Sequence, residues 1–113
     1  MASRLLSPSE LQGLLEDLPE WSIREGALVR EWTLPGFPEA MLFVNRVAAL
    51  AERANHHPDI DIRYSRVLLS LVSHDSGGIT ARDAAMAREL GTVATGTPPR
   101  GPDPGTNSGG MVS

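Results

Sequence analysis

The chain has 113 residues, enough for one small domain but too few for two independent hydrophobic cores. All ten basic residues are arginine, and the absence of lysine and cysteine excludes Schiff-base chemistry, a P-loop lysine, thiolate nucleophiles, disulfides and thiolate metal sites. Fourteen acidic residues give a net charge of −4, which argues against nucleic acid as the main partner and leaves carboxylates, hydroxyls and the histidines His56, His57 and His74 to carry any chemistry.

The amino-terminal residues lack the continuous apolar core of a signal peptide. No apolar run approaches the roughly 18 residues that would cross a membrane. We therefore expect a soluble, cytoplasmic protein without membrane contacts, and the absence of cysteine fits a reducing compartment.

Glycine and proline dominate the carboxyl-terminal segment, where they make up nine of the eighteen residues from 96 to 113. Such a segment buries too little apolar surface to offset the entropy that it would lose on ordering. The composition therefore predicts one folded domain over residues 1–95 and a disordered tail over residues 96–113.

Patterns typical of a helix and a hairpin occupy the first third of the chain. Ser7 is placed to cap a helix that begins at Pro8, and leucines recur at helical spacing until the next proline. Residues 21–24 and 28–32 then alternate between apolar and polar side chains around a turn at residues 25–27. This alternation predicts a β-hairpin with one solvated face.

A second helix and a second pair of strands follow. Apolar residues recur every three or four positions from 37 to 55, which predicts an amphipathic helix. Residues 60–64 alternate in polarity and residues 67–73 form an apolar run, so we expect two more strands. After a glycine-rich turn, Thr80 is placed to cap a last helix that we expect to end at Gly91.

The predicted order of elements is therefore αββαββα, and the fold class is α+β. Because consecutive strands are joined by short turns, the four strands should form a largely antiparallel sheet. We expect the helices to pack on one face of that sheet.

The residues best suited to chemistry are concentrated around the end of the second predicted helix. Glu52 and His56 are four residues apart, so we expect their side chains to meet on one helix face. The carboxylate and the helix dipole would both favour a protonated His56 that can donate a proton. Pro58 should turn His57 in a different direction, and His74, at the far end of a strand, is expected to face the same cleft.

Each of these residues also has a simpler interpretation. A histidine pair at a helix end is most often a solvated cap, Glu52 alone is a surface residue, and His74 before a glycine-rich turn is typical of a loop. Asp83 is most simply the reciprocal partner of the Thr80 cap, and Tyr64 is expected to serve packing. A zinc or iron site is less favoured, because adjacent histidines rarely bind one ion together and no His-x-His or His-x-x-x-His spacing is present.

The spacing of these residues changes their interpretation. Glu52 is followed after three residues by His-His-Pro, after five more by Tyr64, after nine more by His74 and after eight more by Asp83. This pattern resembles in full the signature of the pterin-4a-carbinolamine dehydratases. Further segments resemble the same family, namely the residues around Trp21 and residues 43–48, 55–58, 64–67 and 73–80.

The resemblance implies a dehydratase that removes water from 4a-hydroxytetrahydropterin to give the quinonoid dihydropterin, in the recycling of tetrahydrobiopterin. It implies His56 and His74 as the acid and base. It also implies His57 as a catalytic and substrate-binding group, and Glu52 as a carboxylate that orients the histidines or the pterin. Asp83 is a substrate-binding candidate on the same ground, although we expect it to act chiefly as a cap. Two imidazoles suffice for this proton transfer, so we expect neither a metal nor an organic cofactor.

The family also includes members that act without catalysis, as a dimerisation cofactor for a transcription factor in animals or as assembly factors for the carbon-fixing enzyme. A non-enzymatic binding role on the same fold is therefore the alternative function. We favour the enzyme, because a pure scaffold has no need of Glu52 and all three histidines together. The resemblance further implies a homodimer or homotetramer formed through sheet edges and helices, with a small-molecule pterin as substrate.

Overall fold

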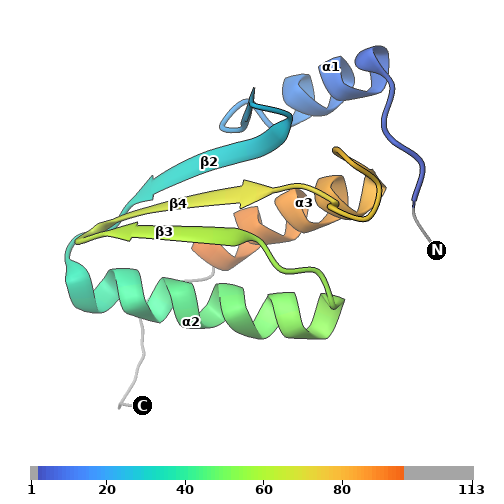
Figure 1. Ribbon diagram of the computed structural model, residues 1–113. Coiled ribbons are helices and arrows are strands. Elements are labelled where there is room, and N and C mark those ends of the chain that lie inside the picture. The colour runs from blue at the N-terminus through green and yellow to red at the C-terminus, as the bar shows by residue number, and fades with distance from the viewer. Residues whose placement is uncertain (1–2, 96–113) are drawn as a thin grey trace.

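The computed structural model describes residues 3–95, which form three helices and four strands in the order αββαββα (Figure 1). The predicted order is therefore confirmed. The elements are α1 (Pro8–Asp17), β1 (Ser22–Arg24), β2 (Ala27–Thr33), α2 (Phe37–Ala54), β3 (Asp59–Arg63), β4 (Arg66–Leu71) and α3 (Ala81–Thr95).

The four strands form one sheet in the order β1-β2-β4-β3, and every neighbouring pair is antiparallel. Helices α2 and α3 cover one face of the sheet, and α1 lies beside the β1–β2 hairpin (Figure 1). The expected α+β fold, with an antiparallel sheet and helices packed on one face, is confirmed. Since β4 is an inner strand, the loop that follows it leads directly into the layer formed by α2 and α3.

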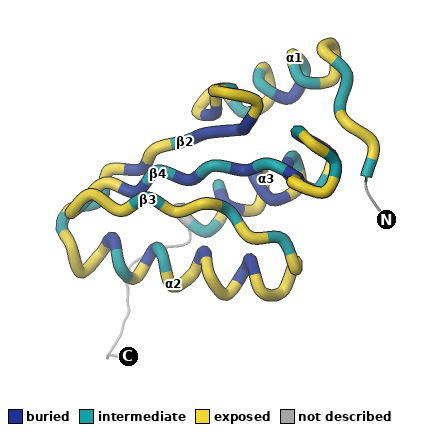
Figure 2. Tube along the Cα trace, viewed as in Figure 1, coloured by how far each residue is buried: buried dark blue, intermediate teal, exposed yellow. Residues whose placement is uncertain are grey.

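The hydrophobic core lies between the sheet and these helices. Val67, Leu69 and Leu71 of β4 are buried and alternate with less buried neighbours, so they face the same side. The strand register places Leu28 opposite Leu71 and Trp32 opposite Val67. The buried positions of α2 lie on the side of the helix that faces the strands (Figure 2). This packed layer fixes where α2 ends and where α3 begins.

Helix α1 begins where the sequence predicts. Ser7 Oγ accepts a hydrogen bond from the Glu10 N–H (3.2 Å), and Glu10 Oε1 accepts one from the Ser7 N–H (2.8 Å), so the two residues form a capping box. The Arg4 guanidinium also donates to Glu10, and this hydrogen bond is the main reason that the pKa of the Glu10 carboxyl is lowered to about 2.

One expectation about local structure is wrong, and another needs to be placed more exactly. The last helix does not end at Gly91 but continues through it, because one glycine costs only about 1 kcal/mol relative to alanine, and Leu90 and Val93 on either side of it pack against the core. Tyr64, which we expect to serve packing, makes its contact at the surface and not in the core. It lies in the β3–β4 turn with a φ angle of 56°, is 72% exposed and stacks on the exposed ring of Phe37.

The predicted tail over residues 96–113 lies outside the described residues, so the domain boundary stays a prediction. Among the helices of residues 3–95, none combines the length and the apolar character that a membrane crossing requires.

Candidate active site

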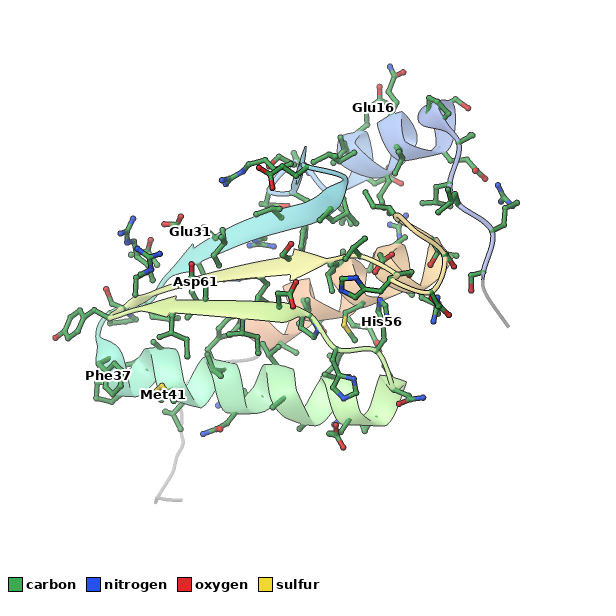
Figure 3. The ribbon with its side chains drawn as sticks, in the orientation of Figure 1. Glu16, Glu31, Phe37, Met41, His56 and Asp61 are labelled. Carbon is green, nitrogen blue, oxygen red and sulfur yellow. The ribbon has the colours of Figure 1, made fainter. Side chains whose placement is uncertain are left out.

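Two loops meet at one end of the sheet, where α2 ends and α3 begins. The first connects α2 to β3 and contains His56 and His57, and the second connects β4 to α3 and contains His74. Figure 3 shows His56 between the end of α2 and the loop that leads into α3. The fold therefore brings the histidine pair close to a loop that follows it by some twenty residues in the sequence.

The end of α2 determines the direction of each neighbouring histidine. Asn55 adopts a left-handed conformation, with φ 51° and ψ 42°. The His56 N–H donates to the Ala51 carbonyl (3.1 Å) and the Asn55 N–H donates to the Glu52 carbonyl (3.3 Å), which is the hydrogen-bond pattern of a Schellman motif. The chain thus leaves the helix before His56, and the spacing rule for one helix face no longer applies to it.

His56 pairs with Asp83 and not with Glu52. Its Nε2 lies 2.6 Å from Asp83 Oδ1, across 27 residues of sequence. The expected contact between Glu52 and His56 is therefore wrong, because the left-handed residue between them ends the helix. The His56 side chain is 11% exposed and that of Asp83 is fully buried, so the two groups pair within the protein interior.

The carboxylate of Asp83 is held by three groups. Oδ2 accepts a hydrogen bond from the Thr80 N–H (2.8 Å) and another from the Ser73 hydroxyl (2.8 Å), while Oδ1 meets His56. The hydroxyls of Ser73 and Thr80 are also 2.8 Å apart. The predicted bond of Asp83 to the Thr80 cap is confirmed, but that bond uses only one of its two oxygens.

His57 points in a different direction from His56, as predicted, and its partner is another carboxylate. Its Nε2 lies 2.6 Å from Glu52 Oε2, and the two side chains are 56% and 78% exposed. Glu52 extends from the last turn of α2, so this pair forms on the solvent side of the helix end. The structure therefore brings His57 and Glu52 together, as a surface pair.

His74 is exposed and begins the turn between β4 and α3. It directly follows Ser73, and the Gly77 and Gly78 N–H groups bond back to the Ser73 carbonyl, which closes the turn. The next residue, Asp75, accepts a hydrogen bond from Arg82 in the first turn of α3. That hydrogen bond is the main cause that lowers the pKa of the Asp75 carboxyl, and it ties the His74 turn to the helix that also carries Asp83.

The chain is similar to proteins of one known family. Residues 4–93 match the family model described as "Pterin 4 alpha carbinolamine dehydratase". The chain belongs to the pterin-4-alpha-carbinolamine dehydratase family. It is 52% identical over 90 residues to a protein of Thermomicrobium roseum, covering 80% of this chain and 97% of that one. It is 50% identical over 91 residues to a protein of Koribacter versatilis, covering 80% and 97% of the two chains. Each of these relatives bears the name "Putative pterin-4-alpha-carbinolamine dehydratase".

Solved structures of pterin dehydratases and their relatives share the fold. A transcriptional coactivator/pterin dehydratase from Brucella melitensis superposes with a TM-score of 0.77 and 31% identity, over 80% of this chain and 99% of that one. A pterin dehydratase-like protein described as a RuBisCO assembly factor of the alpha-carboxysome gives a TM-score of 0.54 at 20% identity, over 66% and 86% of the two chains. The second similarity concerns the fold alone.

Ser73 was not predicted from the sequence to be a site residue of this pterin dehydratase fold. The alternation of buried positions nevertheless indicates it. The alternation that places residues 67, 69 and 71 inside also places residue 73 inside, where Ser73 is 1% exposed. A buried hydroxyl requires a hydrogen-bond partner, so a serine at that position indicates a polar network. Identifying Asp83 as the partner required the tertiary structure.

Metal binding has no evident basis in the described part of the chain. Within residues 3–95, no group of three or more histidine, aspartate or glutamate side chains is arranged to hold a metal ion. His56 and His57 each face a different carboxylate, in different directions. The arrangement offers one imidazole held by a buried carboxylate, and an imidazole can accept and donate protons.

Proposed function

We propose that this chain is a 4a-hydroxytetrahydropterin dehydratase that works by histidine acid–base catalysis in tetrahydrobiopterin recycling. The observation that carries the proposal is the pairing of His56 with the buried Asp83 beside the turn that bears His74. Such a pairing fixes one imidazole, and the hydrogen bond from Ser73 to Asp83 ties it to the turn that carries the second, exposed imidazole. Membership in the dehydratase family supports the same reaction.

The reaction requires two proton transfers and no net change in oxidation state. The C4a–O bond of the substrate breaks and its electron pair leaves with the oxygen, which takes a proton from an acid and departs as water. N5 of the pterin loses its proton to a base, and the electron pair of that N–H bond forms the C4a=N5 double bond of the quinonoid dihydropterin. One imidazolium and one imidazole can supply the acid and the base.

The residues divide into those that transfer protons and those that orient. We assign His56 and His74 to the acid–base pair, because they belong to the two loops that meet at this end of the sheet. His57, with Glu52 beside it, is assigned to binding and orienting the pterin at the solvent side. Asp83 acts on His56 and is not required to touch the substrate.

The direct test is the rate of dehydration with purified protein and freshly prepared 4a-hydroxytetrahydropterin, followed by the appearance of the quinonoid product. Wild-type protein should exceed the uncatalysed rate, and His56→Ala and His74→Ala should each reduce kcat by roughly 10²–10⁴-fold, the usual contribution of a general acid or base. Glu16→Gln, an exposed substitution on α1, is the control and should behave as wild type.

Two outcomes would contradict the proposal. Wild-type protein that does not exceed the uncatalysed rate would exclude the activity, and the non-enzymatic alternative would then be favoured. Loss of activity on treatment with a chelator, with recovery on adding back one metal, would exclude a mechanism that uses histidines alone.

We also propose that the protein is a homo-oligomer. β3 lies at the edge of the sheet, and its Ile60 and Ile62 are 38% and 36% exposed, which is unusual for an edge that stays in solvent. Light scattering coupled to gel filtration should give a mass of two or four chains. A mass of one chain at micromolar concentration would overturn this part of the proposal.

A further inference from the structure

A chain of hydroxyl groups lies behind the His56–Asp83 pair. Ser73, just beyond β4, and Thr80, directly before α3, are 1% and 0% exposed, and their hydroxyls meet at 2.8 Å. The Ser73 hydroxyl also donates to Asp83 Oδ2. Burying hydroxyl groups costs free energy that an alanine or valine of similar size would not, so the network calls for an explanation beyond packing.

The direction of each hydrogen bond follows from the donors available. A backbone N–H only donates, so the Thr80 N–H fixes Asp83 Oδ2 as an acceptor. Ser73 has one hydroxyl hydrogen, and because it is given to Asp83, Ser73 Oγ accepts from the Thr80 hydroxyl. Thr80 Oγ1 in turn accepts from the Arg82 N–H (3.2 Å). All of these bonds therefore run toward the carboxylate.

This direction determines where His56 carries its proton. A carboxylate has no hydrogen to donate and accepts on both oxygens, so the ring nitrogen 2.6 Å from Oδ1, Nε2, is the donor. The neutral imidazole is then protonated on Nε2, and Nδ1 carries the free electron pair. Within residues 3–95 no other group bonds to Nδ1, which leaves this nitrogen for the substrate.

We infer that Ser73 is a positioning residue for His56: by holding Asp83 in one orientation, its hydroxyl keeps the His56 proton on Nε2 and presents Nδ1 to the reacting pterin. The kinetic part of this inference rests on the proposed dehydratase function. The position of the proton is a property of the protein alone and is measured without substrate.

A role in folding alone does not account for the Ser73 hydroxyl. The start of α3 is already capped by Thr80 Oγ1, which accepts from the Arg82 N–H, and by Asp83, which accepts from the Thr80 N–H. Ser73 adds a second donor to the oxygen that Thr80 already holds. With both donors in place the carboxylate cannot rotate about its last bond, and Oδ1 stays aimed at His56.

The test compares Ser73→Ala with the conservative Ser73→Thr, which keeps the hydroxyl. Ser70→Ala is the matched control, because Ser70 is a partly buried serine of β4, the strand that precedes Ser73, and its side chain takes no part in this network. Nitrogen-15 NMR of the full-length protein, at a pH where the imidazoles are neutral, identifies the protonated nitrogen of each histidine. Chemical denaturation of each variant, measured in parallel, establishes that it is folded.

In wild type, Ser73→Thr and Ser70→Ala, the Nε2 of His56 should carry the proton. In Ser73→Ala a substantial Nδ1-protonated fraction should appear for His56 and not for His74. In the dehydratase assay, Ser73→Ala should lower kcat about tenfold or more with KM within about twofold, the expected effect of losing one hydrogen bond to a charged group. Ser73→Thr should restore kcat to within about threefold of wild type.

Several results would overturn the inference. They are an Nδ1-protonated His56 in wild type, a folded Ser73→Ala protein with unchanged tautomer and kcat, or an equal loss of kcat in Ser70→Ala. If Ser73→Ala fails to fold, an Nδ1-protonated His56 in Ser73→Thr, which keeps the donor, would overturn it instead. Absence of dehydratase activity in wild type together with the expected NMR result would reject the proposed function and leave the positioning of His56 intact.

Discussion

The neighbouring residues His56 and His57 each pair with a carboxylate at the same distance, yet the surroundings of the two pairs differ. The Nε2 to oxygen distance is 2.6 Å in both His56–Asp83 and His57–Glu52. In the first pair the side chains are 11% and 0% exposed, and in the second they are 56% and 78% exposed. Distance alone therefore does not rank them.

The difference shows that a carboxylate that is buried and hydrogen-bonded on both oxygens restricts its partner more than an exposed carboxylate does. Charges that face water are screened and lose side-chain entropy when they pair, so an exposed pair contributes little free energy. A buried carboxylate whose other oxygen is already occupied has one orientation available, and removing its partner leaves an uncompensated polar group. We expect His56–Asp83 to determine the chemistry and His57–Glu52 to adjust substrate binding.

Asp83→Asn should give the largest effect. The new amide oxygen keeps the hydrogen bonds from Thr80 and Ser73, but the amide nitrogen then faces His56 and donates to it, which moves the imidazole proton to Nδ1. We expect kcat to fall by roughly 10²–10⁴-fold with the fold preserved, by the logic through which a buried aspartate holds a catalytic histidine in the correct tautomer. Steady-state kinetics measure the loss of kcat, and nitrogen-15 NMR identifies which nitrogen of His56 carries the proton.

The control for this variant is Asp17→Asn at the exposed end of α1, which removes the same charge from a surface pair with Arg88. It should leave kcat within about twofold of wild type, as surface substitutions usually do. A folded Asp83→Asn protein with kcat within about threefold of wild type would show that the buried pair is no more important than an exposed one.

Asn55→Ala should have an intermediate effect. Asn55 ends α2 in a left-handed conformation, and this turn is the reason that His56 does not pair with Glu52. An alanine in the left-handed conformation costs about 1–2 kcal/mol, whereas Asn55→Gly should cost much less. We expect the free energy of unfolding, measured with urea, to fall by about 1 kcal/mol in the alanine variant. Equal stability of the alanine and glycine variants would contradict the assigned role of the left-handed turn.

Local sequence patterns were sufficient for most of the fold. The cap at Ser7, the helix over residues 37–55 and the strand over residues 67–73 follow from periodicity and capping, which depend on residues close in sequence. Gly91 was misjudged because its helix is maintained by packing of Leu90 and Val93, a tertiary effect that outweighs the propensity of one residue.

The site was predictable as a set of residues but not as a set of contacts. The signature named Glu52, the three histidines and Asp83, yet the local rule paired Glu52 with the wrong histidine. That rule assumes a continuous helix, and the left-handed Asn55 interrupts it. The partner of His56 lies 27 residues away, so only the packing of α3 against α2 could identify it.

Glu52→Gln should give the smallest effect and completes the comparison with Asp83→Asn, since both replace the carboxylate of a pair with the same separation. Because the His57–Glu52 pair is exposed, we expect the free energy of unfolding to change by less than about 0.5 kcal/mol and kcat to stay within about threefold. Any loss should appear in KM, because Glu52 is assigned to orienting the group that binds the pterin. High salt should reduce the difference between this variant and wild type, since it screens an exposed pair. A loss of kcat as large as that of Asp83→Asn would mean that the surface pair takes part in proton transfer, and the distinction drawn from burial would then be wrong.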